Sequence, residues 1–437
     1  MNKLKWLYPG IGVKRWIVLI LLGLFLCSIG LAVITEVHLA QIFEQLIVTV
    51  ADYFSGITSL VIKIILALVL FLGGLFLILL ALGKIEQRVS QKFINDTDNE
   101  LIDLLYEDAY LNKGPSIVAL GGGTGLSNLL RGLKKYTSNI TAVVTVADDG
   151  GSSGRLREEM GILPPGDIRN CLIALADREP LMQKLFQHRF SQEGDLDGHS
   201  FGNLFIASMT EMVEGDFEEA VKTSSKVLAI KGQVLPVTNE NIRLGARYED
   251  GSQCIGESEI PETDKKIKNV FLRPDSCQPC AAVLEAIAEA EIITLGPGSL
   301  YTSILPNLMV DGIVEAIKES SALKIYICNV MTQAGETDDF TVADHVRALY
   351  EHTEPGLIDF VLINNQNPPL FLRKKYREEA SFPVTLEKDF FNNENDEFSR
   401  VPEVIEAPLL SSGEYIRHDP GKTAAEIFNL CGGKKNE

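Results

Sequence analysis

A glycine-rich turn followed by an acidic loop carries the residue types best suited to chemistry in this chain. Residues 117–120 are short and apolar, typical of a buried strand, and the turn follows directly. Its residues are Gly121, Gly122, Gly123, Thr124 and Gly125. Glycine lets the backbone lie close to a ligand, and the helix expected at about 126–136 would direct its first N–H groups to the same place. The turn predicts an anion-binding site; a tight strand-to-helix connection without a ligand is the alternative.

Two carboxylates are expected beside this turn. A strand at 140–146 would deliver Asp148 and Asp149 to the carboxyl edge of a parallel sheet, where open α/β proteins bind ligands. The pair would repel a phosphate unless a cation lay between them, and Mg²⁺ is the simplest such ion. Adjacent residues on an extended strand point to opposite sides, so we expect Asp148 to hold the metal. Both aspartates are candidate catalytic residues. The loop residues expected to complete the phosphate site are Gly151, Ser152 and Ser153.

A second glycine turn lies further along the chain. A strand expected at 292–295 runs into Gly296, Gly298 and Ser299. By the same backbone argument this turn could bind an anion, and two such turns suggest a diphosphate ligand. The alternative is a Gly-Pro turn in which Ser299 caps the next helix.

Polar residues at other expected strand ends and helix starts complete the candidate ligand site. They are Asp167, Asn170, His199, Asn203, Asn329 and Thr332. The first four could equally be ordinary helix caps or turn residues. Asn329 and Thr332 follow a strand expected at 324–330 and could contact a base or a sugar.

The overall charge excludes one large class of partners. The chain has 40 Lys and Arg against 59 Asp and Glu, a formal net charge of −19, whereas duplex binding needs clustered basic residues. We therefore expect no nucleic-acid partner, although Arg155, Arg157 and Arg169 could hold a small phosphorylated ligand. The scattered cysteines do not suggest a disulfide framework. Cys277 and Cys280 have zinc or redox spacing but lack a second pair of ligands, so we expect a reduced structural pair.

The N-terminal region has the composition of a membrane hairpin. Residues 16–34 and 64–83 are uncharged runs of 19 and 20 residues, and each can cross a hydrocarbon core of about 30 Å. Basic residues flank the outer ends of the pair, so the positive-inside rule places both termini in the cytoplasm. A cleaved signal peptide is the alternative for the first run. We expect a transmembrane hairpin at 1–83, a juxtamembrane helix and linker at 84–114, and a main domain on the cytoplasmic side of the cytoplasmic membrane.

Residues 115–430 have the pattern of one α/β domain. Strand and helix patterns alternate through most of this region, which predicts a Rossmann-like, doubly wound and mostly parallel sheet. Between about 232 and 275 the pattern changes to short alternating strands with a strong hairpin turn at Asp250 and Gly251. We interpret this stretch as a small β-rich insertion.

Six motifs, in order and spacing, resemble those of the bacterial gluconeogenesis factor family (YvcK-like), which is related to 2-phospho-L-lactate transferase (CofD). They are ALGGGTGLSNLLRGLK, VADDGGSSGRLR, PPGDIRN, GHSFGN, LGPGSLYTSILPNL and NVMTQAGETD. Several ordered motifs are far more specific than one glycine turn. On this resemblance Gly121 to Gly125 match the family's phosphate turn, Asp148 and Asp149 its acidic loop, and Asn203 the amide of its GHS-x-GN segment. The chain departs from the soluble pattern in its N-terminal apolar runs and at 387–400.

The resemblance implies a homodimer that binds UDP-sugars such as UDP-N-acetylglucosamine and supports cell shape and cell-wall synthesis. Our leading hypothesis is a membrane-tethered regulator of this type, which links carbon metabolism to envelope synthesis without turnover or a tightly bound organic cofactor. The first alternative is a Mg²⁺-dependent transferase that moves a phosphoryl-linked group from a nucleotide-activated donor, as the related enzyme moves a phospholactyl group to a deazaflavin alcohol. The second is a membrane scaffold without a ligand.

Overall fold

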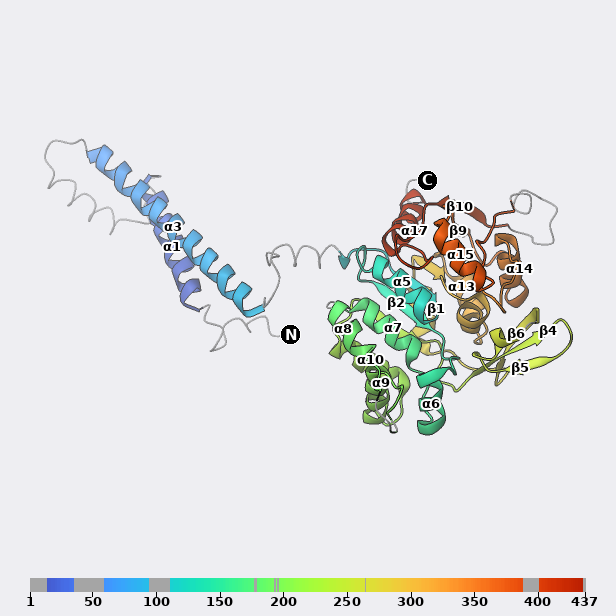
Figure 1. Cartoon of the computed structure of the whole chain (residues 1–437). Coiled ribbons are helices and arrows are strands. Elements are labelled where there is room, and N and C mark those ends of the chain that lie inside the picture. The colour runs from blue at the N-terminus through green and yellow to red at the C-terminus, as the bar shows by residue number, and fades with distance from the viewer. Residues whose placement is uncertain are drawn as a thin grey trace. The chain divides into compact units, whose positions relative to one another are not determined.

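The computed structural model describes residues 14–34, 59–93, 111–176, 179–191, 194, 196–263, 265–387 and 401–434. The chain divides into two compact units, Met1–Glu107 and Asp108–Glu437 (Figure 1). Three predicted features lie wholly or mostly outside the described residues: the loop between the two apolar runs, the linker at 84–114 and the divergent stretch at 387–400.

The first unit contains two long apolar helices, α1 (Lys14–Ile34) and α3 (Ser59–Phe93). They pack closely through glycines, since a Cβ on Gly23 would lie 2.7 Å from the carbonyl oxygen of Gly74. On length and composition, one helix in the described part of the chain could cross a membrane: α3, through its segment Ala67–Lys84. The apolar part of α1, Val18–Leu31, is shorter. This criterion does not confirm the expected pair of spans.

The second unit is built on seven parallel strands in the order β10-β9-β8-β7-β1-β2-β3. Their bounds are β1 (Ile117–Gly121), β2 (Ile140–Val144), β3 (Gln233–Pro236), β7 (Ile292–Leu295), β8 (Leu323–Ile327), β9 (Phe360–Asn364) and β10 (Glu403–Ala407). The central strands are buried on both faces, as apolar parallel strands covered by helices must be. The arrangement confirms the predicted Rossmann-like α/β fold.

The direction of winding reverses between β1 and β7. From β1 the chain proceeds to β2 and β3 toward one edge, and from β7 it proceeds to β8, β9 and β10 toward the other. Right-handed crossovers in both directions place α5 (Gly123–Leu133) and α13 (Ile313–Glu319) on opposite faces. Sheets of this kind bind ligands beyond the carboxyl ends of the strands at such a switch point.

The remaining helices of the second unit surround this sheet (Figure 1). They are α6 (Gly151–Met160), α7 (Gly166–Leu175), α8 (Glu179–Phe186), α9 (Phe201–Met212), α10 (Phe217–Val227), α11 (Ala281–Glu289), the π-helical turn η4 (Leu300–Ile304), α12 (Leu305–Leu308), α14 (Val342–His352), α15 (Leu370–Glu378) and α17 (Pro420–Lys434). Helix α5, which starts at the glycine turn, packs against both α7 and α17.

A small antiparallel sheet projects from the domain, and we call residues 243–273 the β-lobe. Its strands are β4 (Arg243–Tyr248), β5 (Gln253–Ile255) and β6 (Ile267–Arg273), in the order β5-β4-β6, with the short helix η3 (Ile260–Glu262) between β5 and β6. The insertion is narrower than the predicted 232–275. Gln233–Pro236 is β3, which pairs with β2 at the edge of the main sheet.

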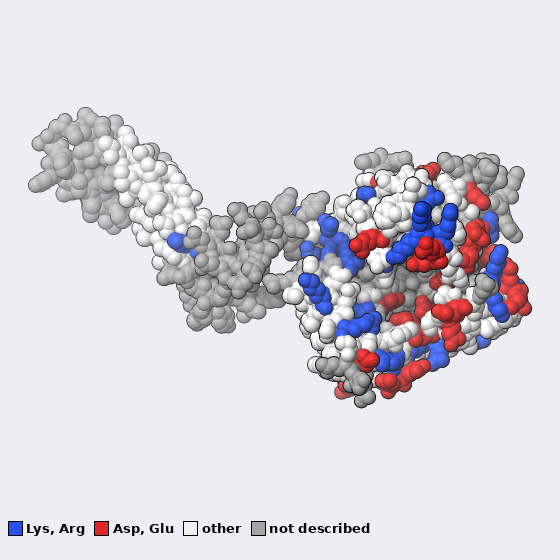
Figure 2. All heavy atoms as spheres, in the orientation of Figure 1, with Lys and Arg blue, Asp and Glu red and all other residues white. Residues whose placement is uncertain are grey.

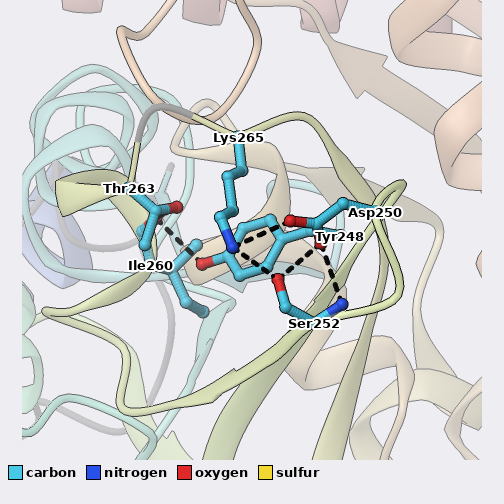
Figure 3. Close-up of polar contacts among 6 residues, drawn as sticks. All are labelled: Tyr248, Asp250, Ser252, Ile260, Thr263 and Lys265. Atoms are coloured by element: carbon cyan, nitrogen blue, oxygen red, sulfur yellow. Dashed lines mark hydrogen bonds and ion pairs between the residues drawn. The ribbon is translucent and has the colours of Figure 1, made fainter.

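The hairpin turn predicted at Asp250 holds the β-lobe together. One carboxylate oxygen of Asp250 accepts the Ser252 N–H at 2.8 Å, and the other pairs with Lys265 Nζ at 2.8 Å (Figure 3). The Lys265 ammonium also lies 5.7 Å from the centre of the Tyr248 ring. The Tyr248 hydroxyl in turn donates to the carbonyl of Ile260 at 3.3 Å. These contacts connect the hairpin to η3 and to the segment that precedes β6.

Candidate functional site

A cleft of about 630 Å³ opens at the switch point. Its lining includes these predicted site residues: Gly123, Thr124, Gly125, Asp148, Asp167, Gly298, Ser299, Asn329 and Thr332. They come from the segments that follow β1, β2, β7 and β8. These segments converge because the carboxyl ends of parallel strands share one edge of the sheet. The structure thus brings both glycine turns and the acidic loop to one cleft.

The two glycine turns touch each other. A Cβ on Gly125 would overlap the carbonyl of Pro297, so this approach requires glycine. Helix α5 begins at Gly123, with Gly122 as its N-cap, earlier than the expected start at 126. The glycines therefore form the first helical turn, whose N–H groups have no partner within the helix.

A carboxylate lies at the start of α5. Asp167, in the first turn of α7, accepts a hydrogen bond from the backbone N–H of Gly123. A Cβ on Gly123 would overlap this carboxylate. Burial and the neighbouring Asp148 raise the pKa of Asp167 to about 7. The N–H group of Gly123 thus favours the ionised carboxyl, although burial outweighs it. A ligand phosphate would share the N–H groups of this helix start with Asp167 or displace the carboxyl.

The adjacent aspartates Asp148 and Asp149 have different surroundings. Asp148 lines the cleft and accepts the Gly150 N–H at 2.9 Å. Burial raises the pKa of Asp148, although hydrogen bonds from Gly150 and Ser153 oppose the shift. Asp149 faces the β-lobe, where its carboxylate accepts the backbone N–H groups of Glu257 at 3.0 Å and Ser258 at 2.9 Å. Asp149 thus ties the β-lobe to the acidic loop and does not line the cleft.

The β-lobe contributes Glu257 to the cleft, a residue that the sequence analysis did not select. Burial, then the nearby Asp148 and Asp167, raise the pKa of Glu257 to about 8. Three carboxyl groups from three separate segments therefore share one electrostatic environment. At neutral pH they cannot all ionise without mutual repulsion.

This acidic environment fits a magnesium ion held by few protein ligands. Among the described residues, no group of three or more His, Cys, Asp or Glu could hold a metal, so a closed metal cage is not formed there. Mg²⁺ usually takes one or two carboxylates, with water and ligand phosphates filling the other positions. Asp148 raises the pKa of Asp167, and the two carboxyls offer such a pair; the sequence analysis expected Asp148 as the metal ligand and did not assign Asp167 to the metal.

Several predicted ligand residues form a buried network beside the cleft instead. The Ser152 hydroxyl lies 2.9 Å from Nδ1 of His199 and accepts from Asn203 Nδ2 at 3.0 Å. Arg169 donates to Asn203 Oδ1 at 2.7 Å and to Asn170 Oδ1 at 3.0 Å. Burial lowers the pKa of His199. The GHSFGN segment therefore joins α6, α7 and α9, and its polar residues satisfy one another.

Other expected residues also lie outside the cleft lining. They are Gly121, Gly122, Gly151, Ser153 and Gly296. Gly121 ends β1, and its carbonyl accepts from Asn307 Nδ2 at 3.1 Å. Two arginines that the sequence analysis named as possible phosphate ligands bind other groups. Arg157 donates to the Asn241 side chain and the Ile242 carbonyl, and Arg155 donates to the Asp197 carbonyl at 2.5 Å.

The second glycine turn presents a side chain at its helix start. Ser299 is the N-cap of η4, and its hydroxyl accepts the Thr302 N–H at 3.4 Å. The same hydroxyl donates to the carboxylate of Glu336. Burial raises the pKa of Glu336 to about 7. The capping role proposed as an alternative for Ser299 is thus formed, while Ser299 still faces the cleft.

The far wall of the cleft comes from the C-terminal part of the domain and was missed by sequence reasoning. It includes Tyr376, Glu379, Ser381, Ile416, Arg417 and His418. Backbone and hydroxyl bonds of Thr332 hold this wall in place, because Thr332 N donates to the Phe382 carbonyl at 2.7 Å and Phe382 N donates to Thr332 Oγ1 at 2.9 Å. The exposed Arg417 supplies positive charge at this wall.

Cys277 and Cys280, which have the spacing of a zinc or redox pair, are structural residues. Cys277 and Cys280 are buried free thiols. Burial raises the pKa of Cys277 to about 11 and raises that of Cys280 further, so neither is a thiolate at neutral pH. They pack as part of the core, as the structural interpretation of the pair predicted.

A parallel sheet with a glycine-lined cleft at its switch point is the arrangement of the doubly wound α/β proteins, which bind ligands at this place. The profile of the family described as 2-phospho-L-lactate transferase CofD matches residues 117–404. The chain belongs to this CofD family, and its full-length relatives are named gluconeogenesis factors.

Three relatives show how far the similarity extends. A putative gluconeogenesis factor from Nostoc sp. is 45% identical over 98% of this chain and 92% of the relative. The gluconeogenesis factor of Bacillus subtilis is 50% identical over 73% of this chain and 99% of the relative. The crystal structure of a UPF0052 family member from Bacillus halodurans superposes with a TM-score of 0.68 at 48% identity, and covers 72% of this chain and 99% of that one.

Proposed function

We propose that the cleft binds a nucleotide diphosphate sugar, in a regulatory protein that links carbon metabolism to cell-wall synthesis and cell shape. The observation that carries this proposal is the contact between the two glycine turns, where Gly125 lies against Pro297. It brings two helix starts to one cleft, and each can receive one phosphate. The volume of about 630 Å³ lies within the range of small-molecule sites. The relatives' name, gluconeogenesis factor, supports the metabolic part of the proposal.

Different residues around the cleft would bind the phosphates, the metal ion and the base or sugar of the ligand. The N–H groups of Thr124 and Gly125 face one phosphate, and Ser299 faces the other. Asp148 and Asp167 would hold Mg²⁺, which would supply the counter-charge that lets carboxylates and phosphates lie close together. Asn329 contacts the base or the sugar, as expected from the sequence.

A Mg²⁺-dependent transferase is the second candidate, favoured by the match to the CofD family. The same residues would then hold a nucleotide-activated donor, and the helix start and metal would stabilise charge on the transferring phosphoryl group. The polar wall around Tyr376 and Arg417 would receive the acceptor alcohol. The two functions differ in one observable, which is the appearance of product.

Calorimetric titration with UDP-N-acetylglucosamine, other UDP-sugars and GDP-activated donors, in Mg²⁺ and in chelator, tests the proposal. We expect binding without turnover. Asp148→Asn and Asp167→Asn should each lower affinity by about tenfold or more in Mg²⁺, because each removes a charged group whose interactions are worth about 1.5–3 kcal/mol, and by less in chelator. Asp275→Asn, an exposed acid outside the cleft, is the control. Product formation would establish the transferase; no binding by any donor would leave only a scaffold.

We also propose that the first unit tethers the protein to the cytoplasmic membrane, with both termini in the cytoplasm. The pair of helices is lined on its outside by exposed large apolar side chains, such as Leu68 and Phe76 on α3 and Phe25 on α1. Such a surface is unfavourable in water and suits a lipid environment. Reporter fusions at the C-terminus and near residue 48 should show activity on opposite sides of the membrane. A C-terminal reporter active only outside the cytoplasm would contradict this topology.

A further inference from the structure

Helix α15 has a buried face and an exposed face of different character. Leu372 packs with Val330, Met331, Leu410 and Ile416 in a small hydrophobic cluster, and Tyr376 borders this cluster. The Tyr376 hydroxyl accepts the backbone N–H of Ile416 at 3.2 Å. Leu372 and Tyr376 are four residues apart and so lie on the same side of the helix. This side anchors α15 beside the cleft.

The opposite side of α15 carries two exposed apolar residues followed by cations. Leu370 is 75% exposed and Phe371 is 68% exposed, although both are large apolar residues. Lys374, Lys375 and Arg377 follow on the same side and are exposed. Figure 2 shows basic side chains gathered over α15 around a smaller group of acidic ones, and Glu378 at the end of the helix is exposed as well. In a chain with a net charge of −19, such a local concentration of cations is a distinct feature.

Residues of the neighbouring loop extend this surface. Tyr415 is half exposed, and the Lys375 ammonium lies 5.0 Å from the centre of its ring. On the same ring, the Arg417 guanidinium carbon lies 4.9 Å from the centre. We call Leu370, Phe371, Lys374, Lys375, Arg377, Tyr415 and Arg417 the α15 surface. It combines two exposed apolar side chains, a tyrosine ring with its hydroxyl, and four cations.

We infer that the α15 surface docks on a membrane leaflet that contains anionic lipids. Large apolar and aromatic side chains next to Lys and Arg are typical of segments that lie at the headgroup level, where the apolar groups enter the acyl boundary and the cations contact lipid phosphates. Lys and Arg can also extend their charged ends to the phosphates while their stems cover apolar surface. The four cations of the surface, Lys374, Lys375, Arg377 and Arg417, are complementary in charge to such a leaflet and outnumber the exposed Glu378 on the same helix.

A protein partner fits this surface less well. A stable protein interface needs about 800 Å² and about 20–30 residues from each partner, whereas the exposed apolar part here is two neighbouring side chains at one end of a short helix. A lipid surface needs no matching shape. Docking would also bring the cleft close to the headgroups, since Tyr376 and Glu379 of α15 line it. The inference concerns the second unit alone and does not depend on the ligand or on the tether.

Co-sedimentation of residues 108–437 with vesicles tests the inference without the apolar helices. This unit is expected to fold alone, because the Bacillus halodurans chain of known structure is covered over 99% of its length by 72% of the present chain. Vesicles of phosphatidylcholine alone and of phosphatidylcholine mixed with phosphatidylglycerol are compared. We expect binding to the anionic vesicles that weakens as salt is added, and little binding to the neutral ones.

Two double variants separate the apolar and cationic contributions. Leu370→Ser with Phe371→Ser, and Lys374→Glu with Lys375→Glu, should each lower partitioning into anionic vesicles by about tenfold or more, as expected when interfacial apolar area or headgroup attraction is lost. All four side chains are exposed, so the fold should be retained, which thermal unfolding checks. The matched control is Lys226→Glu with Val227→Ser, an exposed cation and apolar residue on α10, and it should bind as the wild type does.

Three results would overturn the inference. They are the absence of binding to anionic vesicles, an equal loss in the α10 control, and a change in the oligomeric state of the free protein caused by the α15 variants. The last result would assign this surface to contacts between copies of the chain.

Discussion

The two glycine turns at the switch point are similar in sequence but offer a ligand different groups. The first starts helix α5 with Gly123, Thr124 and Gly125, so it offers the cleft mainly backbone N–H groups, and Thr124 is the one residue among them with a side chain. The second starts the π-helical turn η4, and there the hydroxyl of Ser299 takes the capping position. One turn is therefore a backbone site and the other a side-chain site, which gives two phosphates of one ligand different surroundings.

A carboxyl group with a pKa near neutrality lies at each turn. Asp167 accepts from the N–H of Gly123 at the first turn, and Glu336 accepts from the hydroxyl of Ser299 at the second. Each pKa is raised to about 7, chiefly by burial. Each turn thus has its own titratable carboxyl. The first turn binds it through a backbone N–H group, and the second binds it through a side-chain hydroxyl.

The largest effect is expected from a methyl group at the contact between the turns. In Gly125→Ala the new Cβ would overlap the Pro297 carbonyl, and backbone cannot rotate away as a side chain can. We expect a loss of about 1–3 kcal/mol or more in the free energy of unfolding, as for other overpacked sites, together with loss of ligand binding. Chemical denaturation and calorimetric titration measure the two effects.

Gly298→Ala is the matched control on the second turn. Its Cβ would lie 3.3 Å from the Cβ of Ser303, a contact that a small shift relieves. We expect less than half the loss of stability seen for Gly125→Ala. Equal losses at the two positions would show that the close contact between the turns is not what makes glycine necessary at 125.

The carboxyls at the two turns should make stability depend on pH in a known direction. Because folding raises the pKa of Asp167 and of Glu336 above the ordinary values of 3.8 and 4.5, their stabilising contribution is complete below about pH 4. It is lost progressively as pH rises from about 4 to about 7, the folded-state pKa. Asp167→Asn and Glu336→Gln should therefore gain stability relative to the wild type as pH rises from about 4 to 7, on the order of 1 kcal/mol each, and keep this gain at higher pH.

Denaturant titrations at several pH values measure this gain. Asp275→Asn serves as the control, because it neutralises an exposed aspartate and we expect no such gain in stability from it. If Asp167→Asn shows the gain and Glu336→Gln does not, the second turn holds its carboxyl ionised, and the parallel between the two turns fails.

The sequence was sufficient for features that depend on neighbours along the chain. A strand, a glycine turn and a helix start are local patterns, so the turns at Gly121 to Gly125 and at Gly296 to Ser299 could be predicted. Their meeting at one cleft followed from the parallel sheet. The edge strand β10 was missed because Glu403–Ala407 is only partly buried and has a weak apolar pattern.

Features that depend on contacts between distant segments could not be predicted. His199 and Asn203 have residue types that suit a ligand, yet they bond to Ser152 in a buried network, and sequence cannot distinguish these two uses of a polar side chain. Nor could it place Glu257 and Arg417 in the cleft, since they arrive from the β-lobe and the C-terminal region. The placing of Asp167 beside Asp148 has the same origin, because α7 follows the acidic loop only after another helix.

The smallest effect is expected at the side chain that distinguishes the second turn. Ser299→Ala removes the hydroxyl that accepts the Thr302 N–H and donates to Glu336. Loss of an N-cap costs about 1 kcal/mol in the free energy of unfolding. Because the hydroxyl lowers the pKa of Glu336, its removal should raise that pKa further. Thr341→Ala, which removes the cap of α14, should cost a similar amount of stability.

The two cap variants are expected to differ in ligand binding. Ser299 lines the cleft, whereas Thr341 does not, so only Ser299→Ala should weaken binding of a nucleotide sugar, by about three- to tenfold for one lost hydrogen bond. Calorimetric titration of both variants in the presence of Mg²⁺ measures this. If the two variants lose stability alike and neither loses affinity, Ser299 is a helix cap alone, and the cleft binds its anion at the first turn only.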